Sequence, residues 1–319
     1  MSGFSTDTID NLIRTDIWTP DLKEIFEFEL MGLKYVKLIT DRFPDGDRYN
    51  IPSIGQMETQ DYAEGQPIKY TAMDTGNYQF TINKYKSSGT FISDKMKQDS
   101  MWSPELVGSF VPKMNRALAV AMETDLLSKG NAGQTASDPN TINDGRHRFV
   151  GGGSGNTISV NDFAKAKFAL EKAAVPMTNL IAIVDPSVVF TLATQTNIVN
   201  LLTPNPQWGR IVSENYSTGM RFSVNVFGFD VYTSAYLPKG ISETVSSVAV
   251  TNGVANYFFS AAPDAVPLIG AIRQPPRVEQ ERNKDLQRDE FVVTARWGFD
   301  LYREENMVVC LTDTSTVYS

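Results

Sequence analysis

The chain has 319 residues, 41% of them hydrophobic and 21% charged, so it has enough apolar material to bury a large globular core. No run approaches the roughly 20 apolar residues that cross a bilayer, and the N-terminus lacks the pattern of a secretory signal. Cys310 is the only cysteine, which excludes an intrachain disulfide and favours a cytoplasmic origin. The formal net charge of -8 argues against a protein that grips nucleic acid through its phosphates, but is compatible with one that merely encloses it.

The first fifty residues are predicted to form an arm. Thr19 or Asp21 is suited to cap a short helix, and the spacing of the following apolar residues gives that helix one hydrophobic stripe. Its aromatics, Phe26 and Phe28, fall on more than one face, so the helix is expected to meet a partner as well as its own domain. The turn-rich residues 43–47 are predicted to end this helix.

Residues 51–98 are predicted to form a long two-stranded excursion. Tyr78, Phe80 and Ile82 alternate with polar residues, which is the period of a strand. Residues 68–71, which include Tyr70, supply a partner strand across a turn at 74–77. A hairpin of this kind is marginal alone, so we expect it to dock on another surface.

The strongest helix signal covers residues 103–129. Ser103 suits the N-cap and Pro104 the first helical position, and apolar residues recur every four positions from Leu106 to Leu126. Pro112 is expected either to kink this helix or to mark its true start. The helix is predicted to end at Lys129, with Gly130 as the C-cap.

Residues 130–157 are rich in small and polar residues and predict a long loop between subdomains. A helix beginning at Ser159 or Asn161, a continuously apolar strand at 180–184 and a further helix from Pro186 predict an α/β layer. Strands are expected at 224–232, 248–251 and 257–261.

The alternation of apolar and polar residues at 291–301, followed by a turn and the apolar run 307–311, predicts a terminal hairpin. The preceding residues 273–290 carry five basic and five acidic side chains. They are either a solvated connector or a network of ion pairs between subunits. The candidate residues for such a network are Arg277, Glu279, Glu281, Arg282 and Arg288.

Catalytic and metal-binding signals are weak. His147, the only histidine, lies between two arginines in the predicted loop and is expected to be an exposed loop residue rather than a catalytic one. The glycine-rich residues 151–155 lack the Lys and Ser/Thr of a phosphate-binding loop and are expected to form a hinge or surface loop. One cysteine and one histidine exclude the usual zinc sites, and no cofactor is expected.

The order of these parts resembles the Hong Kong 97 (Johnson) fold of tailed-bacteriophage major capsid proteins. Residues 50–55 are similar to the start of that family's extended loop, and residues 64–68 and 84–94 are similar to the turn and the returning strand of that loop. Residues 227–232, with Leu237-Pro238, are similar to a late strand of the axial domain. Residues 295–299 resemble the return to the peripheral domain, so the resemblance covers nearly the whole chain.

The resemblance implies an α+β, Hong Kong 97-like subunit with four parts. These are an N-terminal arm (1–50), an extended loop (51–98), a peripheral domain with a spine helix (99–157 and 271–319; helix 103–129) and an axial α/β domain (158–270). It implies a non-enzymatic major capsid protein, self-assembling in the host bacterial cytoplasm into hexamers and pentamers of an icosahedral virion shell around double-stranded DNA. A portal protein and, because no helical scaffolding segment precedes the arm, a separate scaffolding protein are the other implied partners.

In that shell the extended loop would lie on a neighbouring subunit. The expected intersubunit residues are Tyr70, Tyr78, Phe80, Ile82, Lys84, Lys86 and the five charged residues of the segment 273–290. Phe80→Asp is predicted to abolish closed shells while leaving a folded subunit. The sequence is also compatible with two alternatives: an encapsulin-like compartment shell that encloses protein cargo, and an α/β enzyme that uses acidic residues.

Overall fold

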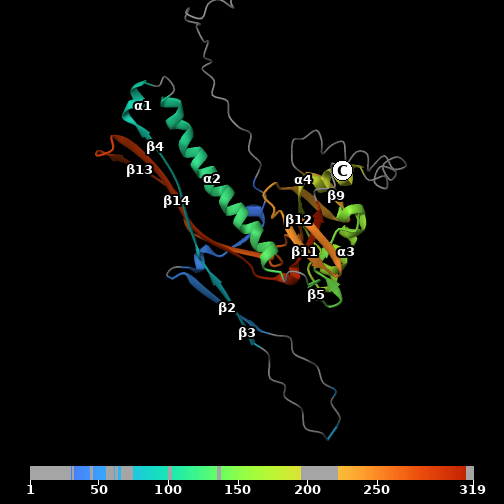
Figure 1. Cartoon of the computed structure of the whole chain (residues 1–319). Coiled ribbons are helices and arrows are strands. Elements are labelled where there is room, and N and C mark those ends of the chain that lie inside the picture. Colours follow the sequence, from blue (N-terminus) through green and yellow to red (C-terminus); the bar gives the residue numbers. More distant parts are fainter. Residues whose placement is uncertain are drawn as a thin grey trace, which may run out of the picture.

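The computed structural model describes residues 30, 32–43, 46–54, 61, 64–65, 75–99, 103–134, 138–194 and 222–313. It has an elongated lobe, built on one long helix and a narrow sheet, and a compact α/β lobe beside the end of that helix (Figure 1). Most of the predicted arm, and with it the predicted capping residues and both arm aromatics, lies outside the described residues, as does Tyr70.

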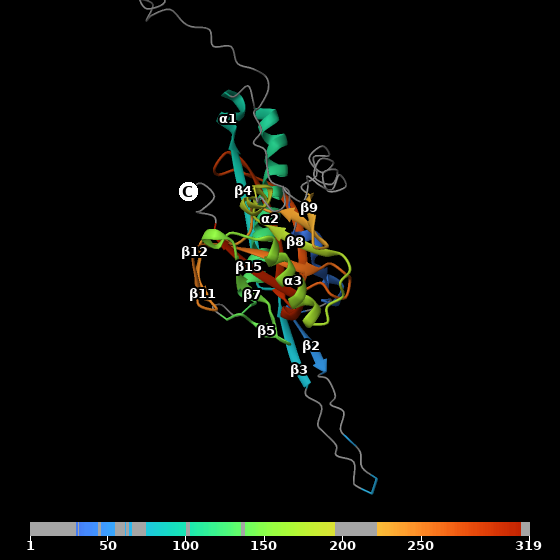
Figure 2. The ribbon, with the colours of Figure 1, turned by 90° about the vertical axis from the view of Figure 1, so that its right-hand side faces the viewer.

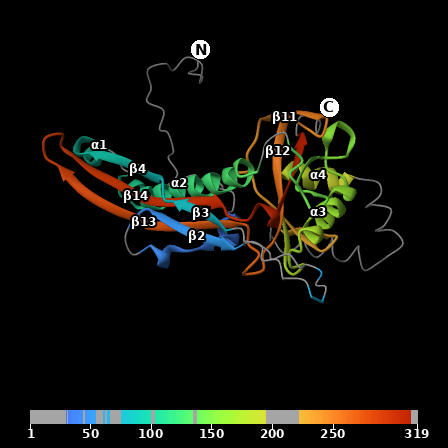
Figure 3. The ribbon, with the colours of Figure 1, turned by 90° about the horizontal axis from the view of Figure 1, so that it is seen from below.

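The elongated lobe is a four-stranded sheet with strand order β1-β13-β14-β4. Its strands are β1 (Lys37–Leu38), β13 (Leu268–Asn283), β14 (Arg288–Leu301) and β4 (Lys84–Ser93). Alternate residues of β14, from Phe291 through Val293 to Trp297, are buried, as the predicted alternation requires. They pack with Met114 and Leu118 of helix α2 (Ser103–Ala132), which lies along one face of the sheet (Figure 3). Residues 273–290 are therefore not a connector but the distal half of the β13–β14 hairpin.

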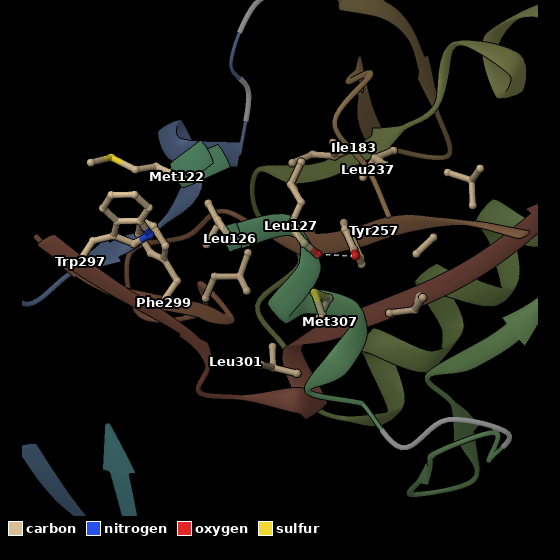
Figure 4. Close-up of a cluster of buried hydrophobic side chains, with 14 of the residues drawn as sticks. Met122, Leu126, Leu127, Ile183, Leu237, Tyr257, Trp297, Phe299, Leu301 and Met307 are labelled. Carbon is tan, nitrogen blue, oxygen red and sulfur yellow. Dashed lines mark hydrogen bonds between the residues drawn. The ribbon is translucent and has the colours of Figure 1, made fainter. Parts of the chain in front are cut away.

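Helix α2 runs for 30 residues without a break at Pro112. The missing backbone donor is tolerated because the residues that follow it, from Met114 to Leu127, are anchored in the main core. The helix continues past the predicted C-cap to Ala132. Gly130 instead allows close packing against Tyr257. A Cβ at Gly130 would lie 3.1 Å from the ring of Tyr257, whose hydroxyl donates to the carbonyl of Leu127 at 2.6 Å (Figure 4).

The compact lobe is a seven-stranded sheet with order β7-β15-β12-β8-β10-β9, and β11 pairs with β12. Its strands are β7 (Arg148–Val150), β8 (Leu180–Val184), β9 (Phe222–Val226), β10 (Phe229–Thr233), β11 (Ile241–Val245), β12 (Val248–Ser260) and β15 (Met307–Asp313). Helices α3 (Val160–Lys172) and α4 (Pro186–Thr194) supply Phe163 and Val188 to a core on one face. The end of α2 covers the other face through Leu126 and Leu127, so the predicted α/β layer is present.

Local signals explain where the helices of this lobe begin. Ser159 is the N-cap of α3, and Asp162 completes a capping box with it. Before α4, the carboxylate of Asp185 accepts the backbone amide of Ser187 at 3.0 Å. Both helices start where the sequence predicts them, because side-chain oxygens satisfy backbone donors that would otherwise be unpaired.

Two predictions about strands are wrong. The last two strands do not form a hairpin: β14 belongs to the elongated sheet, whereas β15 lies between β12 and β7 in the compact one. The segments 248–251 and 257–261 are one strand, β12. Strand β3 (Thr75–Thr81) pairs with β2 (Arg48–Ile54), and its predicted partner, residues 68–71, lies outside the described residues.

The segment predicted to be a loop, 130–157, contains β5 (Thr141–Ile142), β6 (Gly145–Arg146), β7 and the short helix η3 (Ser154–Asn156). The remaining short elements are η1 (Gly32–Tyr35), η2 (Thr40–Arg42), α1 (Asp94–Asp99) and η4 (Glu304–Asn306). The buried carboxylate of Glu123 on α2 accepts the backbone amides of Gly32 at 2.6 Å and Leu33 at 2.9 Å. This contact ties η1, which lies within the predicted arm, to the long helix.

Candidate assembly surfaces

Strands β2 and β3 form a two-stranded ribbon that leaves the body of the molecule (Figures 1 and 2). Their ladder runs from the pair Arg48–Thr81 at the body to the pair Ile54–Thr75, and these two strands make up a sheet of their own. Gly76, Asn77 and Gln79 are exposed along it. We call this feature the β2–β3 ribbon; a two-stranded sheet with solvent around it gains little stability from itself.

The root of the ribbon has its own small core. Phe80 and Ile82 are buried there with Ile39, Phe43 and Ile269. The rings of Phe80 and Phe43 meet edge to face with centroids 5.7 Å apart. This core joins the ribbon to η2 and to the start of β13.

Tyr78 continues the attachment one step outward. Its hydroxyl donates to the carbonyl of Leu301 at 3.3 Å, and its ring lies 5.1 Å from that of Tyr302. Burial, together with the negative charge of Asp300, raises the pKa of Tyr78 far above its usual value. The hydroxyl therefore keeps its proton and remains a donor at any physiological pH.

The burial of Phe80 and Ile82 changes what each can contribute. Neither side chain has surface left to offer a neighbour, since Phe80 is 0% exposed in the single chain. Phe80→Asp would place an unpaired carboxylate in the root core, so the burial of Phe80 argues that this substitution destabilises the subunit rather than leaving its fold unchanged. Whether these residues act between subunits stays a prediction.

Lys84 and Lys86 stand at the start of β4, directly after the ribbon. The Lys84 Nζ lies 3.8 Å from a carboxylate oxygen of Asp125 on α2. The Lys86 Nζ lies 6.0 Å from the centroid of the Trp297 ring. Both ammonium groups thus have loose partners within the chain and stay partly in solvent, where such contacts contribute little stability.

The far end of the elongated lobe carries an ion cluster. The guanidinium of Arg282 donates to both carboxylate oxygens of Asp94 at 2.7 and 3.1 Å and to Asp289 at 3.2 Å. Lys97 also donates to Asp289. Hydrogen bonds from Arg282 and Lys97 hold the pKa values of Asp94 and Asp289, respectively, below their usual range. Helix α1 is thereby fastened to the β13–β14 hairpin.

The other predicted charged residues lie along the same hairpin. Arg288 donates to Glu290 at 2.7 Å and stands over the ring of Phe91, with its guanidinium carbon 4.5 Å from the ring centroid. Arg277 lies 3.7 Å from Glu279, with both side chains well exposed. Glu281 faces Glu290 across the ladder. Four of the five residues therefore have ion partners in their own chain, and a role between subunits stays a prediction.

Two aromatic side chains on β4 were not singled out by the sequence. Tyr85 is 65% and Phe91 55% exposed, and their even spacing places them on one face of a strand whose other edge is unpaired in the described part of the chain. Their alternation was a signal in the sequence, but it did not reveal which face α2 would leave uncovered. Likewise, Asp94 and Arg282 are 188 residues apart, so nothing local predicts that they meet.

His147 is fully buried, so the prediction of an exposed loop histidine is wrong. Its Nδ1 lies 3.2 Å from the carbonyl of Gly145, and burial lowers its pKa. His147 is buried because the adjacent strand β7 pairs with β15 inside the compact lobe.

The glycine-rich run after β7 fits a surface loop. The amide of Gly152 anchors this loop by donating to the Asp162 carboxylate at 2.8 Å.

Within the described ranges, no group of three or more His, Cys, Asp or Glu side chains is arranged to hold a metal ion. The same ranges contain no helix long and apolar enough to cross a membrane.

A family model described as phage capsid protein matches residues 77–309, which is well over half of the chain. The chain belongs to the phage capsid protein family. It is a shell-forming structural protein of the virion capsid, and self-assembly into capsid oligomers is its function.

Solved structures show the same Hong Kong 97-like fold. The chain is 16% identical to that of Mycobacterium phage Che8, covering 94% of this chain and 97% of the other with a TM-score of 0.67. For the acid-stable capsid of Helicobacter pylori bacteriophage KHP30 the identity is 11%, the coverage 98% and 100%, and the TM-score 0.70. For the capsid of cyanophage P-SCSP1u these values are 16%, 95% and 93%, and 0.66. A comparison with curated protein sequences gives no match.

Proposed function

We propose that the chain assembles into hexamers and pentamers of a closed icosahedral shell around double-stranded phage DNA. The β2–β3 ribbon supports this proposal most directly. Its root is packed in a small core of its own molecule, but β2 and β3 pair only with each other among the described strands and extend away from the body (Figure 2). A sheet of two strands reaches stability by packing against something else. A neighbouring subunit is the partner that a self-assembling protein always supplies.

The proposed contacts between subunits involve the residues predicted from the sequence. Tyr78 would meet the neighbour along the ribbon, and Phe80 and Ile82 would hold its root. Tyr70, which lies outside the described residues, is also proposed to contact the neighbour. Lys84, Lys86, Arg277, Glu279, Glu281, Arg282 and Arg288 would give register between subunits, since mixed charges favour specificity over raw affinity.

The enclosed DNA would be held without sequence-specific contacts. The net charge of -8 is unsuited to tight phosphate binding and would let packaged DNA move inside the shell. We further propose assembly in the bacterial cytoplasm with a separate scaffolding protein and a portal protein, and no catalytic activity.

The proposal is tested by light scattering and negative-stain microscopy of the purified chain, alone and together with candidate scaffolding proteins encoded beside it. Closed shells, tubes or curved sheets are expected. Nucleic acid recovered from particles after nuclease treatment would support a DNA container, whereas recovered protein cargo would instead make it an encapsulin-like compartment. A monomer under every condition would contradict shell assembly.

A further inference from the structure

The ribbon and the elongated sheet meet at one glycine. A Cβ added to Gly298 of β14 would lie 2.8 Å from the carbonyl oxygen of Thr81 and 2.9 Å from the Cα of Ile82. Both are backbone atoms, so no side-chain rotation relieves the overlap. The Phe80 ring is the next neighbour at 3.4 Å. Gly298 is therefore the place where a second backbone passes directly over β14, which only a residue without a side chain permits.

The hydrogen-bond ladders show that the chain passes from one sheet to another at this crossing. Strand β4 pairs with β14 as far as Lys84 opposite Trp297, and the ladder stops there, one residue before Gly298. Going back along the chain, Asn83 and Ile82 lie outside both ladders, and β3 then pairs with β2. The chain thus leaves the elongated sheet and enters the β2–β3 ribbon over Gly298.

The contacts around the crossing fix how far the crossing segment stands from β14 and in which direction it continues. The amide of Ile82 donates to the carbonyl of Asp47 at 2.9 Å, which joins β2 to the crossing segment. The root core lies on one side, and the Tyr78–Leu301 hydrogen bond holds the ribbon just beyond it. With these contacts in place, the gap over Gly298 sets the angle at which the ribbon departs.

A small change at this point is amplified along the ribbon. Moving the crossing from 2.9 Å to ordinary contact at 3.4 Å displaces it by about half an ångström. Strands of seven residues span about 23 Å, and the two strands stand about 4.8 Å apart. A half-ångström shift across that spacing tilts the ribbon by roughly a tenth of a radian and moves its far end by roughly 2 Å.

We infer that Gly298 is a positioning residue for assembly: the backbone crossing over it sets the direction of the β2–β3 ribbon and, through it, the curvature of the shell. This inference rests on the proposed function. Head-to-tail contacts between copies close only when each contact imposes the correct rotation, and otherwise they build open or differently sized assemblies. A ribbon tilted at its root would still bind a neighbour, but at a different angle.

Gly298→Ala is the direct test, with Gly152→Ala as its control. Gly152 is an exposed loop residue of the compact lobe, and the atoms nearest to its added Cβ are the ends of the Asp162 and Lys165 side chains at 3.2 Å, which can move aside. Each full-length variant is purified, its thermal unfolding recorded, and its particles imaged under the conditions in which the wild type assembles. We expect Gly298→Ala to unfold cooperatively yet give at least tenfold fewer particles of wild-type diameter, replaced by open, tubular or differently sized ones. Gly152→Ala should match the wild type.

Wild-type particle diameters from folded Gly298→Ala would overturn the inference while leaving shell assembly intact, and absence of wild-type assembly would instead overturn the proposed function. If Gly298→Ala does not fold, Tyr78→Phe replaces it. That variant removes the hydroxyl that holds the ribbon beyond the crossing and leaves a half-buried ring in place. A broadened distribution of particle diameters is then expected, and an unchanged distribution would overturn the inference.

Discussion

His147 is a single titratable side chain whose protonation the fold opposes. Burial lowers its pKa, although the carbonyls of Gly145 and Asn140 and the carboxylate of Glu305 act in the opposite direction. Arg146 and Arg148 flank it in the chain, and the Arg148 guanidinium is engaged with Glu243 at 2.8 Å. The folded state therefore favours the neutral imidazole.

The stability of the subunit should consequently depend on pH near the usual histidine pKa of 6.5. A base with a lowered folded-state pKa binds its proton more readily when unfolded, so its contribution is complete above pH 6.5 and is lost as the pH falls below that value. The loss can reach about 1.4 kcal/mol for each pH unit. Urea unfolding of the unassembled subunit at pH 7.5, 6.5 and 5.5 measures it.

His147→Gln is the control, since it has no titration in this range and no other histidine exists in the chain. Its free energy of unfolding should vary less over these three pH values than that of the wild type. The lowered pKa values of Asp94, Asp289 and Glu290 also make stability fall on acidification, but in the range of carboxylate titration, below about pH 4.5. Equal slopes for wild type and variant would show that His147 is not the cause.

At the scale of elements, the sequence predicted those parts of the fold whose signals are local. Ser103 and Ser159 mark helix starts, and the alternation ending at Leu301 marks a strand, because caps and periodicity act within one or two turns of chain. The partner of β3, the sheet to which β15 belongs and the burial of His147 all depend on contacts between distant segments. No pattern in a single sequence specifies those.

The candidate assembly surfaces likewise include features that the sequence predicts and features that it does not. The excursion that contains Tyr78 was visible as a strand pattern with little sequence nearby to cover it. That Phe80 and Ile82 would be buried in their own chain was not visible, because their partners include Phe43 and Ile269 from segments far apart in the sequence. The crossing at Gly298 was also hidden, since a glycine needed for space has no mark that distinguishes it from others.

Helix α1 is an element whose attachment can be tested. It has six residues and no buried side chain, and Arg282 fastens it through a two-oxygen contact with Asp94. Arg282→Lys keeps the charge but loses the planar fork that matches a carboxylate. We expect the amides of α1 to exchange with deuterium about two- to fivefold faster, while the thermal midpoint of the subunit changes little, since exposed ion pairs add little to global stability.

Salt provides the control for that measurement. Raising ionic strength screens exposed charges and should bring the exchange rate of α1 in the wild type towards that of Arg282→Lys. Lys284→Arg, a change of the opposite kind at an exposed position of the same hairpin, should leave the exchange rate of α1 unchanged. Identical exchange in wild type and Arg282→Lys at low salt would mean that another contact holds α1.

At the scale of the whole molecule, the exposed face of β4 indicates how the subunit differs between solution and shell. Strand β4 is at the edge of the elongated sheet, and Tyr85 and Phe91 project from it into solvent. Exposed edges with large apolar side chains invite pairing with other chains. A shell protein can keep such an edge because a neighbour covers it after assembly.

Tyr85→Lys should therefore leave the subunit as stable as the wild type, because the ring is 65% exposed, but lower the yield of closed shells severalfold. The yield is measured by sedimentation and microscopy, and deuterium exchange should show β4 better protected in wild-type shells than in free subunits. Phe168→Lys on α3, where the ring is 51% exposed, controls for the loss of an exposed aromatic and the gain of a charge. An equal decrease in both variants, or unprotected β4 in intact shells, would show that this edge is not where subunits meet; a decrease confined to Tyr85→Lys would place β4 inside an intersubunit contact.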